Sequence, residues 1–312
     1  MRVATSIRVL NLQRKKSMNK AWWTALTVLV ASILVLPSWA APATFEEVLI
    51  QPSTPADMAL AYGPHPDQFG ELRLPHGTGP HPVVVLVHGG CWMEAFDVAH
   101  IRPLADAVTG LGYATWTLEY RRPDGTQDPW PATFADVARG LDELRELAEE
   151  NALDLEGLTI VGHSAGGQLA LWLAARPRFA DDHPLYMPDP LAVTRVLALA
   201  PITDMAAFAV TDEGCNGGAR RVVGGAPQDW PDRFRAVSPV DNLPLGTRLE
   251  LVHAVNDRIV PLAQSEDFAQ LFSTAGGEVV LHALAEPAGH FDVLLTYGEA
   301  WSLLERLLDK RR

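Results

Sequence analysis

A serine flanked by glycines stands between a predicted strand and a predicted helix near the middle of the 312-residue chain. Residues 158–161 are apolar and rich in β-branched side chains, which predicts a buried strand. The sequence GHSAG (residues 162–166) follows, and residues 168–175 predict a helix. A G-x-S-x-G sequence at such a junction is typical of a nucleophile elbow, a strained turn that needs little side-chain bulk around the serine. Ser164 is therefore the candidate nucleophile; the alternative is a glycine-rich turn without chemistry.

The serine needs a base, because its hydroxyl is a weak nucleophile until a neighbouring group takes the proton. Four histidines follow Ser164 in the chain. His253 and His282 fall inside predicted strands and His183 falls in a polar loop, whereas His290 follows the last predicted strand. Reacting groups of open α/β sheets lie on loops beyond the carboxyl ends of the strands. His290 is thus the candidate general base and acid, with a structural loop histidine as the alternative.

An acidic residue must then orient the imidazole and stabilise its protonated form. Asp257 follows the strand that ends at His253, and it gives the chain order Ser, Asp, His. Asp204, which follows the preceding strand, is the competing candidate. A capping role for Asp257 at the next helix, near Pro261, also stays open.

Acyl transfer further requires N–H donors that face the developing oxyanion. Ala165, directly after the serine, offers one. The sequence HGGCW (residues 88–92) follows another predicted strand, and its glycines let the backbone approach a substrate, so Gly90 and Cys91 are the further candidate donors. The chain has no ligand cluster at metal-binding spacing, so we expect neither a metal nor an organic cofactor.

Several side chains near these motifs are candidates for lining a substrate pocket. Each alone is more often ordinary packing, and we expect two or three of the five aromatic residues to contact substrate. The candidates are Trp92, Phe96, His163, Trp130, Phe208 and Phe291. The sequence EYRR (residues 119–122) ends a strand and is expected to form a charge-paired brace beneath the site.

The elements that position these residues alternate along the chain. Buried strands are predicted at 83–87, 114–118, 158–161, 195–200, 249–253 and 279–284, and helices at 98–111, 134–150, 168–175, 262–274 and 297–308. Residues 45–50, 58–62 and 71–74 predict short antiparallel strands, and residues 201–247 predict irregular structure. We therefore expect one α/β domain over residues 41–312, with a mostly parallel sheet, helices on both faces and an antiparallel N-terminal edge.

The first 40 residues differ from the rest in kind. They carry six Lys or Arg and no Asp or Glu, followed by an uncharged run over 21–36 and by the small residues Ser38 and Ala40, three and one positions before the expected cleavage. This pattern predicts a signal peptide cleaved after Ala40, and hence a periplasmic or secreted protein. Two alternatives stay open: residues 1–17 are an extension caused by a wrong start codon, since Met18 begins a more usual signal, or the segment is an uncleaved membrane anchor.

Cleavage would leave 38 acidic and 19 basic residues, a net charge of −19. Such a domain is a poor partner for nucleic acid or for an anionic membrane surface. The chain has two cysteines, Cys91 and Cys215. In an exported protein a pair suggests one disulfide, although two buried free thiols are the alternative.

With these motifs in order, the chain resembles the α/β-hydrolase superfamily, specifically its esterases and lipases with an HGG oxyanion loop. It is most similar to bacterial feruloyl-esterase-like and kynurenine-formamidase-like hydrolases, on the strength of the sequences YGP (62–64), LRLP (72–75), HGGCW, EYRR and GHSAGG. The resemblance implies a Ser164, Asp257, His290 triad with Gly90 and Ala165 as oxyanion donors. Cys91 and the absence of a predicted lid helix in 205–235 depart from the pattern.

We therefore expect a serine hydrolase that cleaves small carboxylic esters, or formyl amides, through an acyl-enzyme. A peptidase of the prolyl-oligopeptidase type is the first alternative, although about 270 mature residues leave no room for its usual additional domain. A non-enzymatic binding protein on a hydrolase scaffold is the second. The sequence does not determine the acyl group, the leaving group or the oligomeric state.

Overall fold

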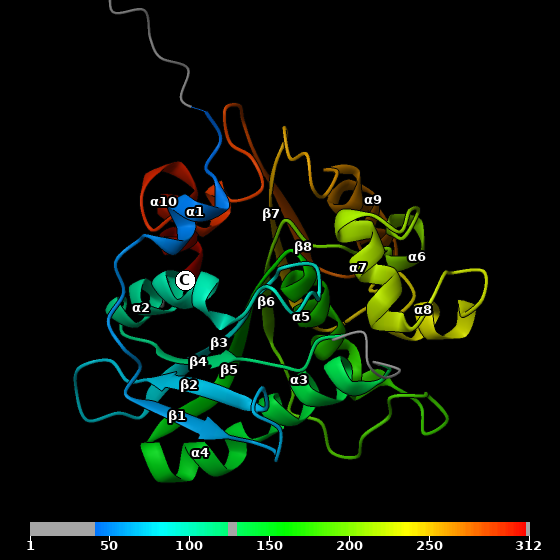
Figure 1. Cartoon of the computed structure of the whole chain (residues 1–312). Coiled ribbons are helices and arrows are strands. Elements are labelled where there is room, and N and C mark those ends of the chain that lie inside the picture. Colours follow the sequence, from blue (N-terminus) through cyan, green and yellow to red (C-terminus); the bar gives the residue numbers. More distant parts are fainter. Residues whose placement is uncertain (1–40, 124–129, 310–312) are drawn as a thin grey trace, which may run out of the picture. The chain divides into compact units, whose positions relative to one another are not determined.

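An eight-stranded sheet carries the candidate residues (Figure 1). The structure is a computed structural model that describes residues 41–123 and 130–309. The predicted signal segment and its cleavage site lie outside the described residues. The strands stand in the order β1-β2-β4-β3-β5-β6-β7-β8. Their bounds are β1 Met58–Ala61, β2 Phe69–Arg73, β3 His81–Val87, β4 Ala114–Leu118, β5 Leu153–His163, β6 Arg195–Leu199, β7 Arg248–Ala254 and β8 Val279–Leu284.

The pairing confirms the predicted mixture of directions. Strands β1 and β2 pair antiparallel with each other, and β2 pairs antiparallel with β4. All pairs from β4 through β3 and β5 to β8 are parallel. Parallel strands place their carboxyl ends at one edge of a sheet, so the loops after β3, β5, β7 and β8 open toward the same side.

Helices cover both faces of the sheet (Figure 1). Because side chains alternate along a strand, Val84 and Leu86 of β3 pack with α1, α2 and α10, whereas Val83 and Val85 pack with α3, α5 and α9. The α-helices are α1 Phe45–Leu49, α2 Arg102–Gly110, α3 Ala132–Asp142, α4 Leu144–Asn151, α5 Ala165–Ala175, α6 Met205–Phe208, α7 Gly214–Val223, α8 Pro231–Val237, α9 Ala263–Thr274 and α10 Gly298–Leu308. The short 3₁₀ helices are η1 Val98–Ile101, η2 Arg176–Arg178 and η3 Asp292–Leu294.

The prediction of a strand at residues 45–50 is wrong. This segment is the helix α1, and its start is fixed by a reciprocal pair of hydrogen bonds. The Thr44 hydroxyl accepts from the Glu47 N–H at 3.2 Å, and the Glu47 carboxylate accepts from the Thr44 N–H at 2.7 Å. This capping box satisfies N–H groups at the helix start, where no preceding turn supplies carbonyl partners.

The prediction of irregular structure over residues 201–247 is also wrong, because this stretch contains α6, α7 and α8. Glycines inside α7 hid its helical character. A side chain at Gly217 would place its Cβ 2.1 Å from the Asp212 carbonyl oxygen, and one at Gly218 would place it 2.1 Å from the Cys91 carbonyl oxygen. The glycines therefore permit close packing rather than breaking the helix. The predicted helix 134–150 divides into α3 and α4 at Glu143.

Two further findings concern membrane-spanning helices and the two cysteines. In the part of the chain that the structure describes, no helix has the length and apolar character needed to cross a bilayer. The structure joins Cys91 and Cys215 by a disulfide, with the sulfurs 2.11 Å apart. This bond connects the loop after β3 to α7, two segments separated by 124 positions in the chain.

Candidate active site

Ser164 occupies the turn between β5 and α5 in a strained backbone conformation. Its φ is 55° and its ψ is −118°, in a region that residues with a Cβ rarely adopt. The Ser164 N–H donates to the Leu199 carbonyl oxygen at 2.8 Å, which fixes the turn against β6. A Cβ at Gly166 would lie 2.1 Å from the Val87 carbonyl oxygen, so the turn can close onto β3 only with glycine there. The Ser164 Oγ is buried and has no hydrogen-bond partner among the described residues.

His290 and Asp257 meet at the same edge of the sheet. His290 lies in the loop after β8 and Asp257 in the loop after β7, and the His290 Nδ1 is 2.6 Å from the Asp257 Oδ2. The other carboxylate oxygen, Oδ1, accepts from the N–H groups of Ile259 at 2.8 Å and Val260 at 2.9 Å. The His253 Nε2 lies 3.4 Å from Oδ2. The carboxylate is thus held from three sides.

The environment of Asp257 favours its ionised form. Burial alone would raise its pKa, but hydrogen bonds from His253 and His290 and from the Val260 N–H hold that pKa well below the usual range. An ionised Asp257 accepts from His290 Nδ1–H and leaves Nε2 as the nitrogen that can take a proton. Asp204 instead caps α6 by accepting from the Ala207 N–H at 2.8 Å. The structure therefore brings Asp257, and not Asp204, to His290.

The loop after β3 lies directly against the serine. A Cβ at Gly89 would lie 3.0 Å from the Ser164 Cβ and 2.6 Å from the His163 carbonyl oxygen. Gly90 has a φ of 97° and Cys91 a φ of 57°, so the backbone turns sharply at the two candidate donors. The Ala165 N–H belongs to the first turn of α5, where the helix offers it no carbonyl partner. The three candidate donors accordingly belong to two segments that meet at Ser164.

Two buried histidines connect these segments. The His163 Nε2 donates to the His290 carbonyl oxygen at 3.1 Å, and the His100 Nε2 accepts from the Gly89 N–H at 3.1 Å. Burial, followed by the proximity of His290, lowers the pKa of His163 to about 3. Burial, followed by the proximity of His88, also lowers the pKa of His100 well below its usual value. Both rings therefore stay neutral and act as fixed hydrogen-bonding groups.

Glu119 joins the loop after β3 to the end of β4. Its carboxylate accepts from the His88 ring at 2.9 Å and from the Val98 N–H at 2.8 Å, and it pairs with the Arg122 guanidinium. Burial alone would raise the pKa of Glu119, but His88 and Arg122 lower it to about 2. This is the charge-paired arrangement expected of residues 119–122. The neighbouring Arg121 pairs outside it, with Asp136 at 2.7 Å.

The six candidate lining residues divide into two groups. Trp92, His163 and Phe208 are buried, with at most 4% of their surfaces exposed. Phe96, Trp130 and Phe291 are half-buried. The Phe291 ring lies 5.2 Å from the His290 ring, and the Phe96 Cβ would be 2.3 Å from a Cβ at Gly90. Trp130 packs against Phe134. Of the six, Phe96 and Phe291 thus border the candidate catalytic loops with partly exposed rings.

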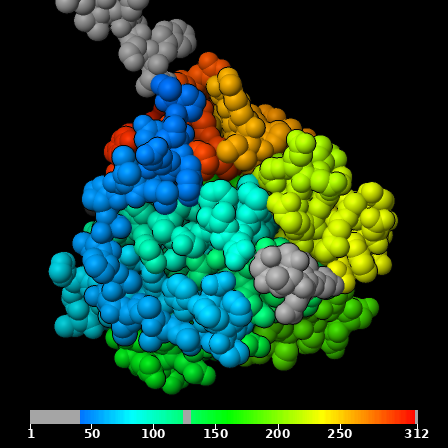
Figure 2. Space-filling model, in the orientation of Figure 1, coloured from blue at the N-terminus to red at the C-terminus, as the bar shows by residue number. Residues whose placement is uncertain are grey.

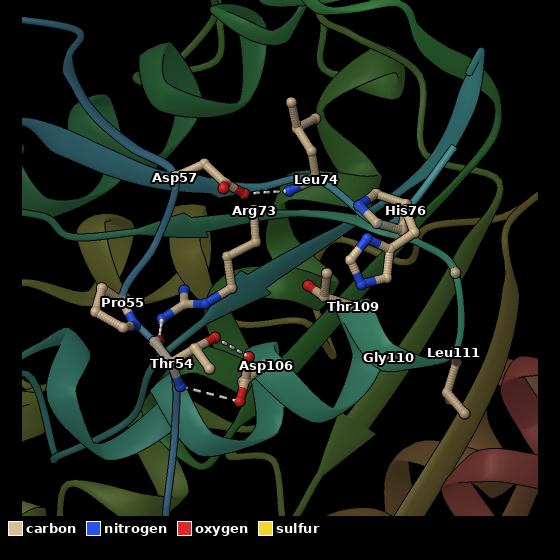
Figure 3. A pocket seen from close by; sticks show the side chains of 12 residues that line it. Thr54, Pro55, Asp57, Arg73, Leu74, His76, Asp106, Thr109, Gly110 and Leu111 are labelled. Atoms are coloured by element: carbon tan, nitrogen blue, oxygen red, sulfur yellow. Dashed lines mark hydrogen bonds between the residues drawn. The ribbon is translucent and has the colours of Figure 1, made fainter. Parts of the chain in front are cut away.

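A separate cavity of about 660 Å³ lies at the other edge of the sheet (Figure 3). It is lined by Arg73 at the end of β2 and by Gly112 just before β4. Arg73 pairs in register with Thr115, near the start of β4, so this cavity faces away from the carboxyl ends that carry Ser164. Arg73 donates to the Thr54 carbonyl oxygen at 3.1 Å. Within residues 41–123 and 130–309, no group of three or more His, Cys, Asp or Glu is arranged to hold a metal ion.

Comparison with known proteins places the chain in a family. The family model described as BD-FAE matches residues 71–272. The chain belongs to the BD-FAE family. The matched stretch of this BD-FAE chain includes Ser164 and Asp257 but ends before His290.

Curated relatives include two proteins of Mycobacterium tuberculosis (strain ATCC 25618 / H37Rv). The chain is 29% identical to esterase LipQ over 221 residues, which cover 69% of this chain and 51% of LipQ. It is 26% identical to the probable carboxylic ester hydrolase LipM over 225 residues, with 70% and 51% covered. The BD-FAE chain thus spans about half the length of these curated relatives.

Solved structures confirm the α/β-hydrolase fold that the sequence predicts. Esterase B from Lactobacillus rhamnosis (HN001) superposes with a TM-score of 0.69 at 19% identity, over 84% of this chain and 88% of that one. A truncated carbohydrate esterase from gut microbiota gives a TM-score of 0.68 at 17% identity, over 86% and 98%. At these identities the likeness concerns the fold alone.

Three residues near the site escaped the sequence analysis: Phe45, His100 and Asp292. The apolar run places Phe45 in a predicted strand, although Thr44 and Glu47 carry the capping-box signal that predicts α1. Asp292 lies two positions after His290, where an acidic residue could have been read as a loop cap. His100 gives no signal in the sequence, because its bond to the Gly89 N–H depends on how η1 packs against the loop after β3.

Proposed function

We propose that this BD-FAE chain is a serine hydrolase that cleaves small carboxylic esters. The observation that carries the proposal is the 2.6 Å contact between His290 Nδ1 and Asp257 Oδ2. His290 is also hydrogen-bonded to His163, the residue before a serine in a strained strand–helix turn. The family membership and the two mycobacterial relatives, one described as an esterase and one as a probable carboxylic ester hydrolase, support ester bonds as the target.

In the proposed reaction the Ser164 Oγ attacks the ester carbonyl carbon while His290 Nε2 takes the hydroxyl proton. The carbonyl π electrons move to the oxygen, whose negative charge is stabilised by the N–H groups of Ala165, Gly90 and Cys91. His290 then gives its proton to the departing alcohol as the C–O bond breaks, leaving an acyl group on Ser164. Water, deprotonated by His290, cleaves the acyl-enzyme in the same way and releases the carboxylic acid.

The electrostatics support these roles. Asp257 stays ionised because its hydrogen bonds hold its pKa far below neutral pH, and this negative charge stabilises the imidazolium formed during each step. His100 and His163 stay neutral, so neither adds a competing positive charge next to His290. Formyl amides could be cleaved by the same steps, with an amine as the leaving group.

Hydrolysis should be screened across short p-nitrophenyl esters, feruloyl esters, N-formyl aryl amides and peptides. We expect ester cleavage by the wild type and a fall in kcat of roughly 10⁶-fold in Ser164→Ala, by analogy with serine hydrolases generally. A fluorophosphonate probe should label the wild type and not the variant. Cleavage of peptides but not of esters, or full activity in Ser164→Ala, would refute the proposal.

We also propose that the protein is exported. The basic, then apolar, N-terminal sequence supports this location, and so does a disulfide, since such bonds persist in oxidising compartments. N-terminal sequencing of the protein from the periplasm or medium should begin at Ala41. Recovery of the intact chain in the cytoplasm or the membrane fraction would contradict the proposal.

A further inference from the structure

The loop that carries His290 is tied to the first residues that the structure describes. One oxygen, Asp292 Oδ2, accepts from the Gly289 N–H at 2.8 Å and from the Ala43 N–H at 2.9 Å. A Cβ at Gly289 would lie 2.8 Å from the Pro42 Cβ, so the N-terminal segment also packs against the residue before His290. Asp292 therefore anchors the segment at residues 42–43 to both sides of His290.

A second tie lies at the other end of this segment. Gln51 is buried, and its Nε2 donates to the Leu294 carbonyl oxygen at 3.2 Å. Its Oε1 accepts from the Thr296 N–H at 2.8 Å and from the Thr296 hydroxyl at 3.0 Å. Between the two ties, the fully buried Val48 places α1 in the core. The segment is thus fastened at both ends to residues 289–296.

A third contact reaches the oxyanion loop. The Phe45 ring centroid lies 5.6 Å from that of Phe291, which neighbours His290, and 5.2 Å from that of Phe96, edge-to-face. Phe96 in turn packs against Gly90. In Figure 2 the blue residues after position 40 lie against the red residues near the C-terminus. The helix α1 therefore bridges the loop of the proposed base and the loop of the proposed oxyanion donors.

We propose that residues 42–51, the N-terminal strap, with their anchor Asp292, position His290 and the oxyanion loop for the reaction. The strap contacts no reacting atom; it acts by fixing the two loops that do. This role rests on the proposed hydrolase function. Rates of such reactions are sensitive to placement, since a displacement of about 1 Å can cost roughly 100-fold.

The anchor can be tested with a pair of variants at one position. Because a single oxygen accepts both N–H groups, Asp292→Asn retains an acceptor and Asp292→Leu does not. We expect Asp292→Leu to lower kcat about 10- to 100-fold with KM changed less than threefold. Asp292→Asn should restore kcat to within about threefold of wild type. Asp154→Leu is the matched control, since Asp154 also accepts a local N–H, from Glu156 at 2.9 Å, but lies at the start of β5.

The helix is tested by Phe45→Ala, with Leu49→Ala as its control because Leu49 is 44% exposed on the same helix. Phe45→Ala should lower kcat and Leu49→Ala should not. Hydrogen exchange of residues 287–296, followed by mass spectrometry, gives a readout independent of turnover. Exchange there should rise in Asp292→Leu and in Phe45→Ala, while thermal unfolding shows that both variants are folded.

Three outcomes would overturn the proposal that the strap positions His290 and the oxyanion loop. They are unchanged kcat in both Asp292→Leu and Phe45→Ala, equal loss in Asp292→Asn and Asp292→Leu, or increased loop exchange without loss of kcat. If Asp292→Leu does not fold, Phe45→Ala decides alone by the same criteria. A wild type that neither cleaves esters nor reacts with the fluorophosphonate refutes the hydrolase function itself. An active wild type whose strap variants have the same kcat refutes only the role of the strap.

Discussion

Asp257 receives hydrogen bonds on both carboxylate oxygens while its side chain is wholly buried. At the scale of single residues, this carboxylate is held by donors from three sides. A buried carboxylate would normally take up a proton, and here the surrounding donors reverse that tendency. The protein thus maintains a negative charge next to His290, which the proposed reaction requires because His290 gains a proton during it.

Replacing Asp257 by asparagine should remove this charge with little change of shape. We expect Asp257→Asn to lower kcat by roughly 10⁴-fold, because the amide favours the wrong imidazole tautomer. Steady-state hydrolysis of the best ester from the screen measures this loss. Asp204→Asn, at the competing candidate, should stay within a few-fold of wild type. A larger loss in Asp204→Asn than in Asp257→Asn would exchange their roles.

The buried histidines make a prediction about pH. Since the pKa of His163 is about 3 and those of His100 and Asp257 are lowered, none of the three changes charge between pH 5 and 8. The acid limb of kcat/KM should therefore fall with a slope of one, as protonation of a single base stops the reaction. His163→Phe should lower kcat without changing this slope. A slope of two in the wild type would show that a second group takes up a proton in this range and would contradict the prediction.

At the scale of elements, the loop after β3 packs against the turn between β5 and α5. The two backbones come so close that only glycine fits between them. The Cβ of an alanine at position 89 would lie 2.6 Å from the His163 carbonyl oxygen. We expect Gly89→Ala to displace the oxyanion loop and to lower kcat by roughly 10²- to 10³-fold, the cost of losing one oxyanion donor. Gly110→Ala, where the added carbon meets nothing within 4 Å, is the control. Equal kcat values for Gly89→Ala and Gly110→Ala would show that the position of this loop does not affect the reaction.

Glu119 links this loop to β4, and its effect on stability should depend on pH. Its pKa is lowered from a usual 4.5 to about 2, so its ionised form stabilises the fold fully above about pH 4.5 and less as pH falls toward 2. Glu119→Gln should cost about 3 kcal/mol of unfolding free energy at pH 7, measured in urea, and progressively less below pH 4.5. Glu146→Gln, exposed on α4, controls for lost charge. If the loss of unfolding free energy in Glu119→Gln stayed constant below pH 4.5, the ion-pair explanation would be contradicted.

The elements also show what a sequence can predict. The GHSAG turn and the apolar runs on either side of it predict β5 and α5, because the strand, the turn and the helix are adjacent in the sequence and form one local pattern. Asp257 and His290 are predicted by assuming that strand ends meet at one edge, and the parallel register does bring the two side chains together there. The helix α7 was missed because its glycines serve contacts with Asp212 and Cys91, and such contacts become visible only after folding. The contribution of Phe45 depends in the same way on tertiary packing.

At the scale of the whole molecule, the disulfide joins segments that the chain separates by 124 positions. In the chain-entropy model a loop of that length adds about 5 kcal/mol, and native bridges typically contribute 2–5 kcal/mol. The double variant Cys91→Ser/Cys215→Ser should therefore unfold at a lower temperature than wild type. A reductant should lower the Tm of the wild type to that of the variant and leave the variant unchanged. A wild type insensitive to reductant would contradict the bridge.

The same bond has a consequence for how the protein is made. The chain contains two cysteines in all, so only one pairing exists within it. Cys91 leaves the ribosome long before Cys215 and must wait, unpaired, until more than a third of the chain has followed. Production in quantity therefore calls for an oxidant but no isomerase to correct wrong pairings. The one wrong pairing that is still possible is a disulfide between two chains, and a high concentration of incompletely synthesised chains would promote it.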